Sequence, residues 1–297
     1  MWKYVVLRLG YLLFGRLPLP ALYAIAHIVG DGAYLFRRTA RRGVLANMRQ
    51  VMGPEVDERA VRRAAREVFR NGTRYYADLY HTPHLDPLEF LQRRLDVEGL
   101  EHFEAARDSG RGAVVVSAHF GNPEIAIQGL ATLGFSLYGL TEELHPKRLS
   151  DFTQWLRSHH GHEYRTVSFG AVKEAIRRVR AGGFVAILLD RDVRGTGVPM
   201  QLCGAETRVP LGAVDLALRT GGVLIPAWTR RIEGYRFEVR IEPPLEPIRT
   251  GSFDEDVRAN AQRLLTLFEA RLKKDPGQWA VLEGIFTPAD ETESSAG

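Results

Sequence analysis

The chain has 297 residues, of which 45% are hydrophobic and 26% charged, and it carries a net charge of +4 at pH 7. This composition excludes a largely disordered protein, and the length allows one large domain or two small ones with a full apolar core. The single cysteine, Cys203, excludes an intramolecular disulfide framework and fits a reducing compartment, so we expect it to be a small buried apolar side chain.

The first 36 residues are rich in apolar and aromatic side chains. Two arginines and two prolines interrupt this run, which disfavours a secretory signal. A membrane span needs roughly 20 largely apolar residues, whereas residues 17–36 include two prolines, a histidine and an aspartate. A basic cluster follows directly: Arg37, Arg38, Arg41, Arg42 and Arg49. Apolar helices beside a basic cluster are typical of a peripheral or monotopic protein on the anionic, cytoplasmic face of the plasma (inner) membrane. Helices packed on the core with a solvated basic face are the alternative.

Residues 57–80 are predicted to form one long helix, because apolar residues recur there at helical spacing with arginines between them. A basic helix could bind nucleic acid, but no zinc-finger, RNA-binding or basic-zipper signature accompanies it, so we exclude nucleic acid as a partner. A solvated basic face is the simpler interpretation, with an acidic protein or anionic lipid as a possible partner. We therefore divide the chain into a helical membrane-interface region over 1–90 and a second domain over 91–287, with a disordered acidic tail over 288–297.

From residue 95 onward, strand and helix signals alternate, which predicts an α/β fold with a mainly parallel central sheet covered by helices. The expected strands are 113–118, 135–140, 164–169, 184–189, 223–228 and an alternating edge strand over 235–241. The expected helices are 101–108, 123–133, 147–159, 172–181, 211–219 and 253–273.

The stretch over residues 112–124 carries the clearest chemical signal. A Val-rich run suited to a strand buried on both faces ends at His119. Gly121 permits a tight turn, Asn122 is a good helix N-cap and Pro123 suits the first helical position, so a helix should start there with Glu124 in its first turn. In open α/β sheets, ligands bind at the carboxyl ends of the strands, which is where this turn should lie.

A histidine that hydrogen-bonds a carboxylate is a general base with a fixed tautomer. His119 is the expected base, and its partner is either Glu124 or one of Asp190 and Asp192, which follow the predicted strand over 184–189. No catalytic serine is evident, so the nucleophile would be a hydroxyl of the substrate. A buried histidine satisfied by a backbone carbonyl is the alternative, and Arg191 could make the two aspartates a structural ion-pair cluster instead.

Other motifs are absent or uninformative. His159, His160, His162 and Glu163 fit no standard metal-site spacing, so we predict no metal site. The sequence has no phosphate-binding P-loop, dinucleotide fingerprint or nucleophile elbow, and we predict no cofactor. Arg157 and Arg194 could hold a phosphate or carboxylate through their planar guanidinium groups.

His-x4-Glu after a Val-rich strand resembles the glycerolipid acyltransferase signature. The form His-Phe-Gly-Asn-Pro-Glu over 119–124 is similar to that of bacterial lipid A acyltransferases and the related phosphatidylinositol mannoside acyltransferases. The resemblance covers nearly the whole chain and departs at 200–204, where the family usually carries a more aromatic segment. It also rests on Thr141 to Leu144, Arg157, Gly161, Leu189 to Asp192, Gly195, Gly197, Gly204, Arg208, Pro210, Gly212, Arg219 to Gly221, Ile225, Pro226 and Pro276 to Trp279.

The resemblance implies a membrane-associated O-acyltransferase that moves a fatty acyl group from acyl-CoA or acyl carrier protein to a hydroxyl of a glycolipid. It implies His119, Glu124, Asp190 and Asp192 as catalytic residues. The residues that it implies for substrate binding are Asn122, Glu142, Arg157, Arg191 and Arg208. A thioester or lipid hydrolase that uses the same histidine and carboxylate, and a noncatalytic lipid-binding protein, are the alternatives.

Overall fold

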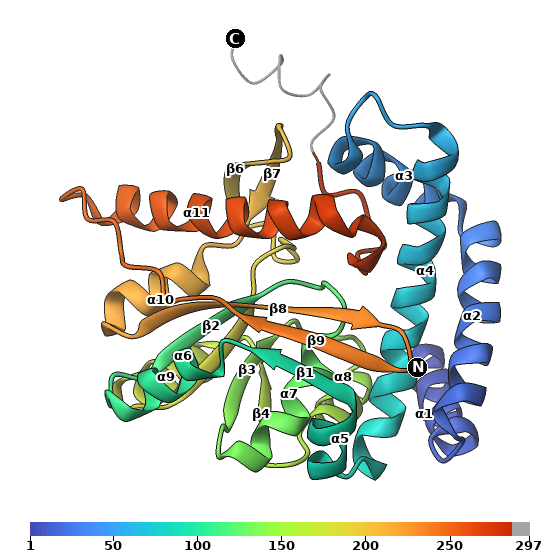
Figure 1. Cartoon of the computed structure of the whole chain (residues 1–297), viewed down its shortest axis with the longest axis horizontal. Helices are drawn as coiled ribbons and strands as arrows, with labels where there is room; N and C mark the ends of the chain where they lie inside the picture. The colour runs from blue at the N-terminus through green and yellow to red at the C-terminus, as the bar shows by residue number, and fades with distance from the viewer. Residues whose placement is uncertain (287–297) are drawn as a thin grey trace.

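The protein folds around one seven-stranded sheet with helices on both faces, in a computed structural model that describes residues 1–286 (Figure 1). The strand order is β1-β9-β8-β2-β5-β3-β4, and all neighbours are parallel except β8 and β9. The strands, in sheet order, are Leu95–Glu98, Arg236–Ile241, Val223–Ile232, Ala113–Ser117, Phe184–Leu188, Leu137–Thr141 and Glu163–Thr166. The predicted fold class is therefore confirmed, and the expected tail over 288–297 lies outside the described residues.

One prediction about the strands was wrong, and two features were missed. The strand over 235–241 was expected at an edge, but β9 lies between β8 and β1. The edge strand β1 was not predicted, because Leu95–Glu98 has only four residues and lacks a clear apolar run. A separate hairpin of β6 (Val198–Leu202) and β7 (Ala205–Val209), which packs against helix α11, was also missed.

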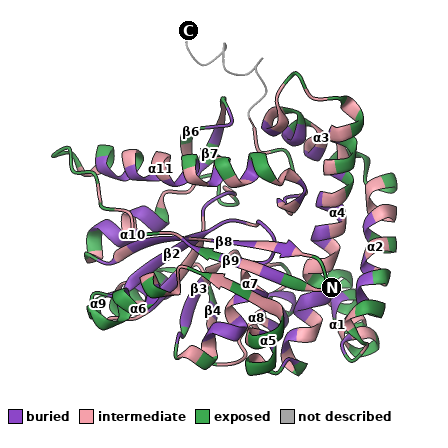
Figure 2. Cartoon of the chain, in the orientation of Figure 1, coloured by how far each residue is buried: buried purple, intermediate pink, exposed green. Residues whose placement is uncertain are grey.

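Helices cover the two faces of the sheet in two groups (Figure 2). One face carries α6 (Leu100–Asp108) and α7 (Pro123–Leu130). The other face carries α9 (Phe169–Arg180), α10 (Gly212–Thr220) and α11 (Phe253–Lys274). Strand β2 lies in the middle and is buried along its whole length, as its continuous apolar run predicts. The remaining helices of this part are α5 (Pro87–Arg94), α8 (Lys147–Arg157) and the short 3-10 turns η1 (Thr82–His84), η2 (Ala131–Leu133) and η3 (Pro276–Gln278).

The first four helices of the chain stand along one end of the sheet (Figure 1). They are α1 (Trp2–Phe14), α2 (Leu19–Phe36), α3 (Arg38–Met52) and α4 (Glu58–His81). Residues of α3 and α4 belong to the same apolar cluster as β2, α10 and α11. The boundary placed near residue 90 therefore follows a change of secondary structure, and the two parts share a core.

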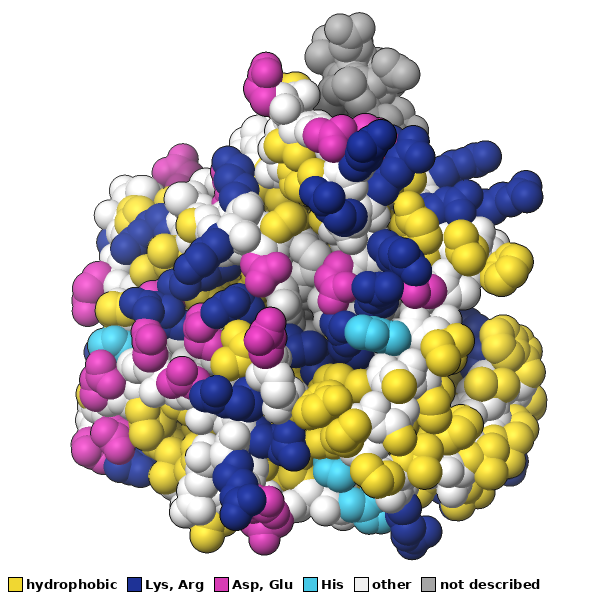
Figure 3. Space-filling view, turned by 45° about the vertical axis from the view of Figure 1, so that its right-hand side comes forward, with side chains coloured by type: hydrophobic (Ala, Val, Ile, Leu, Met, Phe, Trp, Pro, Cys, Tyr) yellow, Lys and Arg dark blue, Asp and Glu magenta, His cyan; other side chains and the backbone are white. Residues whose placement is uncertain are grey.

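Helices α1 and α2 expose large apolar side chains, which gather at one end of the molecule with arginines beside them (Figure 3). The exposed residues are Trp2, Val5, Val6, Leu9, Leu12, Leu13, Ile28, Val29, Leu35 and Phe36. Helix α2 is also the one helix in the described residues that is long and apolar enough to cross a membrane. Its buried side nevertheless packs on α4, where Arg66 and Arg70 both donate to the carboxylate of Asp31.

Candidate active site

The carboxyl end of β2 delivers His119 to the mouth of a large cavity, and Asn122 begins helix α7 just beyond it. The side chain of Asn122 accepts a hydrogen bond from the Ile125 amide at 3.3 Å, and Pro123 occupies the first helical turn. Both features were predicted from the sequence. Gly121 has a φ of +65°, and a Cβ atom there would lie 2.1 Å from the Thr229 carbonyl oxygen, so only glycine fits this turn.

Asp190 is the carboxylate that contacts the imidazole. Strands β2 and β5 are parallel and in register from Ala113 with Phe184 to Ser117 with Leu188, so His119 and Asp190 leave the sheet side by side. The His119 Nδ1 atom lies 3.0 Å from the Asp190 Oδ1 atom, and the His119 backbone amide donates to the same carboxylate at 3.1 Å. Asp190 is fully buried, whereas 33% of the His119 side chain is exposed.

Trp279 completes this arrangement by donating its indole N–H to the Asp190 Oδ2 atom at 2.7 Å. Burial alone would raise the pKa of the Asp190 carboxyl, but the His119 imidazole and the hydrogen bonds from His119 and Trp279 outweigh it and lower that pKa. Asp190 is therefore ionised at neutral pH and accepts hydrogen bonds only. In the neutral form of the His119 imidazole, Nδ1 is then the atom that carries the proton, and Nε2 keeps a lone pair.

Glu124 belongs to a second cluster. Its carboxylate lies 2.7 Å from the Arg157 guanidinium and accepts a hydrogen bond from the Tyr75 hydroxyl at 2.6 Å. Arg157 also donates to the Tyr75 hydroxyl at 2.6 Å. Burial would lower the pKa of Arg157, but the Glu124 carboxylate and the Tyr75 hydroxyl more than offset it, so the pKa is raised and the ion pair stays charged. Of the three carboxylates that were possible partners for His119, Asp190 contacts the imidazole and Glu124 pairs with an arginine.

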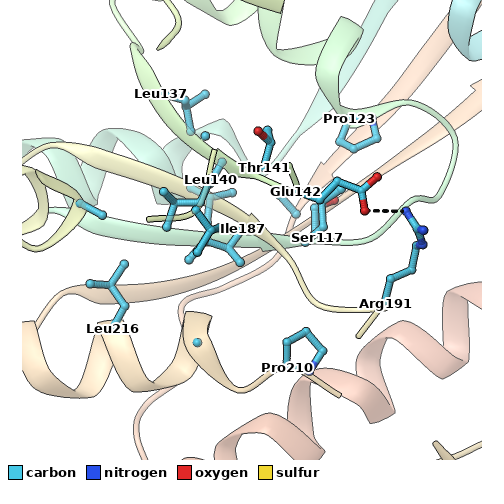
Figure 4. A pocket seen from close by; sticks show the side chains of 18 of the residues that line it. Ser117, Pro123, Leu137, Leu140, Thr141, Glu142, Ile187, Arg191, Pro210 and Leu216 are labelled. Carbon is cyan, nitrogen blue, oxygen red and sulfur yellow. Dashed lines mark hydrogen bonds and ion pairs between the residues drawn. The ribbon is translucent and has the colours of Figure 1, made fainter. Parts of the chain in front are cut away.

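The cavity has a volume of about 820 Å³ and lies between the sheet and its helices (Figure 4). Its lining comes from both faces of the sheet, with Val115 and Ile127 from one face and Ile176 and Leu216 from the other. Most of the lining surface is apolar, and His119 lies among its polar and charged groups. Clefts of this size and character commonly hold small molecules with long apolar parts.

A gap between β3 and β5 connects the two faces. The two strands pair only as far as Gly139 and Ala186, after which β3 continues beside β4 and β5 beside β2. Leu140, Thr141 and Ile187, just beyond the last pair, line the cavity (Figure 4). Ala186 and Ile187 are consequently half-buried although β5 is an inner strand.

The other predicted site residues fall into two groups. Glu142, Arg157, Arg191 and Asp192 line the cavity, with Arg191 lying 3.5 Å from Glu142 and 2.7 Å from Glu283. Asn122 and Arg208 do not line it. The Arg208 side chain donates to the Gly197 carbonyl at 2.6 Å and lies 3.6 Å from Asp192.

Asp192 itself accepts a hydrogen bond from the Thr196 amide at 3.1 Å, so it holds the loop that follows β5. The catalytic role implied for Asp192, and the substrate contacts implied for Asn122 and Arg208, stay predictions.

Of the histidines near residue 160, His162 has a structural role. His162 is buried, with its Nδ1 atom accepting from the Leu137 amide at 3.2 Å and its Nε2 atom 2.9 Å from the Ile127 carbonyl. Within residues 1–286, no group of three or more His, Cys, Asp or Glu side chains could hold a metal ion. Cys203 is buried as predicted, and burial raises the pKa of its thiol to about 12.

Two residues of the site were missed in the sequence. Trp279 lies within the segment that contributed to the family resemblance, but nothing local linked it to Asp190, 89 residues away. Tyr75 lies 49 residues before Glu124 in an amphipathic helix, where an aromatic residue most often serves packing. Only the tertiary fold brings either residue to the site.

The fold places a histidine–aspartate pair beside a large, mostly apolar cavity, an arrangement that suits an enzyme acting on lipids. The sequence profile of the bacterial lipid A biosynthesis acyltransferases matches residues 1–286, and the chain belongs to this family. It is 29% identical over 228 residues to the phosphatidylinositol mannoside acyltransferase of Mycobacterium tuberculosis (strain ATCC 25618 / H37Rv), which covers 74% of this chain and 69% of that protein. It is 27% identical over 288 residues to the enzyme of the same name from Mycolicibacterium smegmatis, covering 94% of this chain and 90% of that protein.

Proposed function

We propose that this acyltransferase moves a fatty acyl group from a thioester, acyl-CoA or acyl carrier protein, to a hydroxyl of a glycolipid, with His119 as the general base. The observation that carries this proposal is the His119 imidazole, which has its Nδ1 atom fixed by Asp190 while the ring faces an apolar cavity of about 820 Å³. The cavity would hold the acyl chain and place the thioester carbonyl beside the imidazole.

The reaction needs one proton carrier. The acceptor hydroxyl attacks the thioester carbonyl carbon while the His119 Nε2 atom takes its proton, and the Asp190 carboxylate stabilises the resulting imidazolium. The tetrahedral intermediate then collapses, the carbon–sulfur bond breaks, and the leaving sulfur takes the proton back from His119. General base catalysis of this type contributes about 10²- to 10⁴-fold, and fixing the two substrates in place supplies much of the remainder.

Charged groups around the cavity are candidates for holding the polar parts of the substrates. Glu142 and Arg191 form a pair at its wall, where they can offer both an acceptor and donors to a sugar. Arg194 also lines the cavity and forms no hydrogen bond or ion pair within residues 1–286, so it is available to a phosphate.

The acceptor is proposed as a glycolipid of the lipid A precursor or phosphatidylinositol mannoside type. The name of the family and the names of the mycobacterial relatives support this class. An acceptor of this type carries many hydroxyl groups on a lipid anchor, so the enzyme has to work at a membrane surface.

The exposed apolar residues of α1 and α2 would give it that access. Trp2, Leu13 and Phe36 are among the most exposed large apolar side chains of the protein, at 71%, 67% and 83%. Arginines of α3 follow directly and would attract anionic headgroups, at about 1 kcal/mol each near the surface. We therefore propose peripheral or monotopic binding to the cytoplasmic face of the plasma membrane.

The test is acyl transfer from radiolabelled palmitoyl-CoA, or from palmitoylated acyl carrier protein, to a panel of extracted glycolipids. Wild type should label one glycolipid class. His119→Ala should abolish labelling, and Asp190→Asn should lower kcat by at least about 10²-fold, because the neutral amide stabilises the imidazolium poorly.

Two results would overturn the proposal. Equal release of free palmitate with and without glycolipid would identify a hydrolase. Lipid binding without any turnover in wild type would identify a binding protein.

A further inference from the structure

A buried polar cluster lies directly behind the catalytic turn and takes no part in the proton transfer. It consists of Tyr23 from α2, Asp78 from α4, Asn122 at the start of α7 and Arg231 from β8. All four side chains are at most 8% exposed. Four elements of the fold therefore meet at one set of hydrogen bonds.

Asp78 is the centre of the cluster. Its Oδ1 atom accepts a hydrogen bond from the Tyr23 hydroxyl at 2.5 Å. Its Oδ2 atom accepts from the Arg231 guanidinium at 2.6 Å and from the side-chain amide of Asn122 at 2.8 Å. Arg231 also donates to the Tyr23 hydroxyl. Burial, followed by the nearby Asp78 carboxylate, raises the pKa of Tyr23 well above its ordinary value, so Tyr23 remains a neutral donor.

The cluster holds the catalytic turn from two sides. On one side, Asp78 holds Asn122, whose side chain also caps α7. On the other side, the Arg231 backbone exchanges two hydrogen bonds of 3.0 Å with the Gln278 side chain, while the Gln278 carbonyl accepts from the Gly121 amide at 2.9 Å. Arg231 thus connects to both Gly121 and Asn122, the second and third residues after His119.

The same C-terminal segment also touches the histidine itself. The Ala280 amide donates to the His119 carbonyl at 2.8 Å, and Trp279, between Gln278 and Ala280, donates to Asp190. The turn from His119 to Asn122 is therefore held by Asp78 on one side and by residues 278–280 on the other, and Gln278 in turn contacts the Arg231 backbone.

From these contacts we infer that Tyr23, Asp78 and Arg231 are positioning residues for the acyl-transfer reaction, an inference that rests on the proposed function. They fix the backbone after His119 so that its imidazole meets both Asp190 and the cavity. A buried ion pair such as that of Asp78 and Arg231 adds little to stability compared with an apolar replacement. We therefore infer that the role of this pair is to specify one geometry of the surrounding backbone.

Tyr23 extends this role to α2. The buried side of α2 carries Tyr23, while its opposite side exposes Ile28 and Val29 at 73% and 54%. The helix proposed to contact lipid therefore contributes a hydrogen bond to the support of the active site. Removing that hydroxyl should affect turnover although the tyrosine does not line the cavity.

The experiment compares Tyr23→Phe with Tyr34→Phe in the glycolipid transfer assay. Both changes delete one hydroxyl from α2, but within residues 1–286 the Tyr34 hydroxyl forms no hydrogen bond, and its ring packs on Phe69. Tyr23→Phe should lower kcat about fivefold, the equivalent of one ordinary hydrogen bond, with KM for the donor unchanged. Tyr34→Phe should retain wild-type kcat.

A double variant separates positioning from stability. Asp78→Leu with Arg231→Met replaces the ion pair by apolar groups, which commonly preserves folding, but Asn122 loses its partner. We expect a folded protein with kcat lowered about tenfold or more and with the donor KM within twofold of wild type.

The NMR signal of the His119 ring, in protein isotopically labelled at histidine Cε1, gives a readout that needs no substrate. The signal is assigned by its absence in His119→Ala. This signal should shift in Tyr23→Phe and in the double variant, but not in Tyr34→Phe. Unchanged kcat or an unchanged His119 signal in both cluster variants would overturn the inference. If wild type transfers no acyl group, the proposed function fails, and the ring signal alone then decides the inference.

Discussion

The indole N–H of Trp279 donates a hydrogen bond to the carboxylate of Asp190 at 2.7 Å. This contact connects the C-terminal part of the described residues to the loop that follows β5. Phe120 and Trp279 also form an isolated antiparallel bridge beside it. The C-terminal segment therefore contributes to the candidate active site, although it lies far from the histidine motif in the sequence.

Replacing Trp279 by Phe should weaken catalysis without emptying the core. The fully buried ring is largely retained, but Asp190 loses one donor to its charged form, so the pKa of Asp190 should rise toward its ordinary value. We expect kcat to fall about fivefold to tenfold at pH 7. Steady-state kinetics at pH 7 provide the measurement. Trp155→Phe is the control, since Trp155 is 46% exposed, and equal kcat for wild type and Trp279→Phe would contradict the prediction.

Gly121→Ala should destabilise the protein more than an alanine at another glycine with positive φ. Gly134 has a φ of +83° with open space around it. Gly134→Ala should therefore lower the free energy of unfolding by only about 1 kcal/mol, the penalty for an alanine in the left-handed backbone conformation. At Gly121, the new methyl would also meet the Thr229 carbonyl, which forces the turn to move. Urea unfolding of both variants measures the difference, and equal losses of stability would show that the turn tolerates a side chain.

The sequence predicted the parts of the fold that local pattern controls. The Val-rich run over 113–117 and the cap at Asn122 are complete signals by themselves, so both β2 and α7 were placed correctly. The place of β9 between two strands and the existence of β1 depend on which strands meet, which no local pattern specifies. Similarly, spacing alone could not choose between Glu124 and Asp190 as the imidazole's partner, because the choice depends on the parallel register of β2 and β5 and on the arginine beside Glu124.

Stability should fall between about pH 6.5 and pH 4 because of His162. Burial lowers the pKa of this imidazole to about 4, whereas in the unfolded chain the value is about 6.5. The unfolded state therefore binds the proton first as the pH falls, and folding loses up to about 3 kcal/mol over this window.

Urea unfolding at pH 7, 5.5 and 4.5 tests this, with His162→Asn expected to flatten the pH dependence and His102→Gln to leave it as in wild type. An equally steep dependence in His162→Asn would assign the effect to other groups.

Filling the gap between β3 and β5 should shorten the acyl chain that the enzyme accepts. Ala186 lies in the last pair of these strands and lines the cavity, so Ala186→Phe would place a ring in the passage. Transfer from palmitoyl-CoA should fall about tenfold or more, while transfer from hexanoyl-CoA should change little, because a short chain need not pass the ring. Ala181→Phe, at the exposed end of α9, is the control. Equal losses with both donors would mean that the chain lies elsewhere.

Membrane binding should depend on the exposed face of α1. Val6 and Leu13 are 61% and 67% exposed, and burying both in a lipid surface contributes a few kcal/mol, since a fully buried side chain of this kind is worth about 1.5–3 kcal/mol. Val6→Glu with Leu13→Glu should therefore weaken cosedimentation with vesicles of phosphatidylcholine and phosphatidylglycerol by at least about tenfold. Leu88→Glu, at an exposed apolar position on α5, should bind like wild type. The arginines of α3 add an electrostatic contribution, so vesicle binding of wild type should also weaken as the salt concentration rises. If neither the α1 substitutions nor salt changes vesicle binding, helices α1 to α3 do not form the membrane interface.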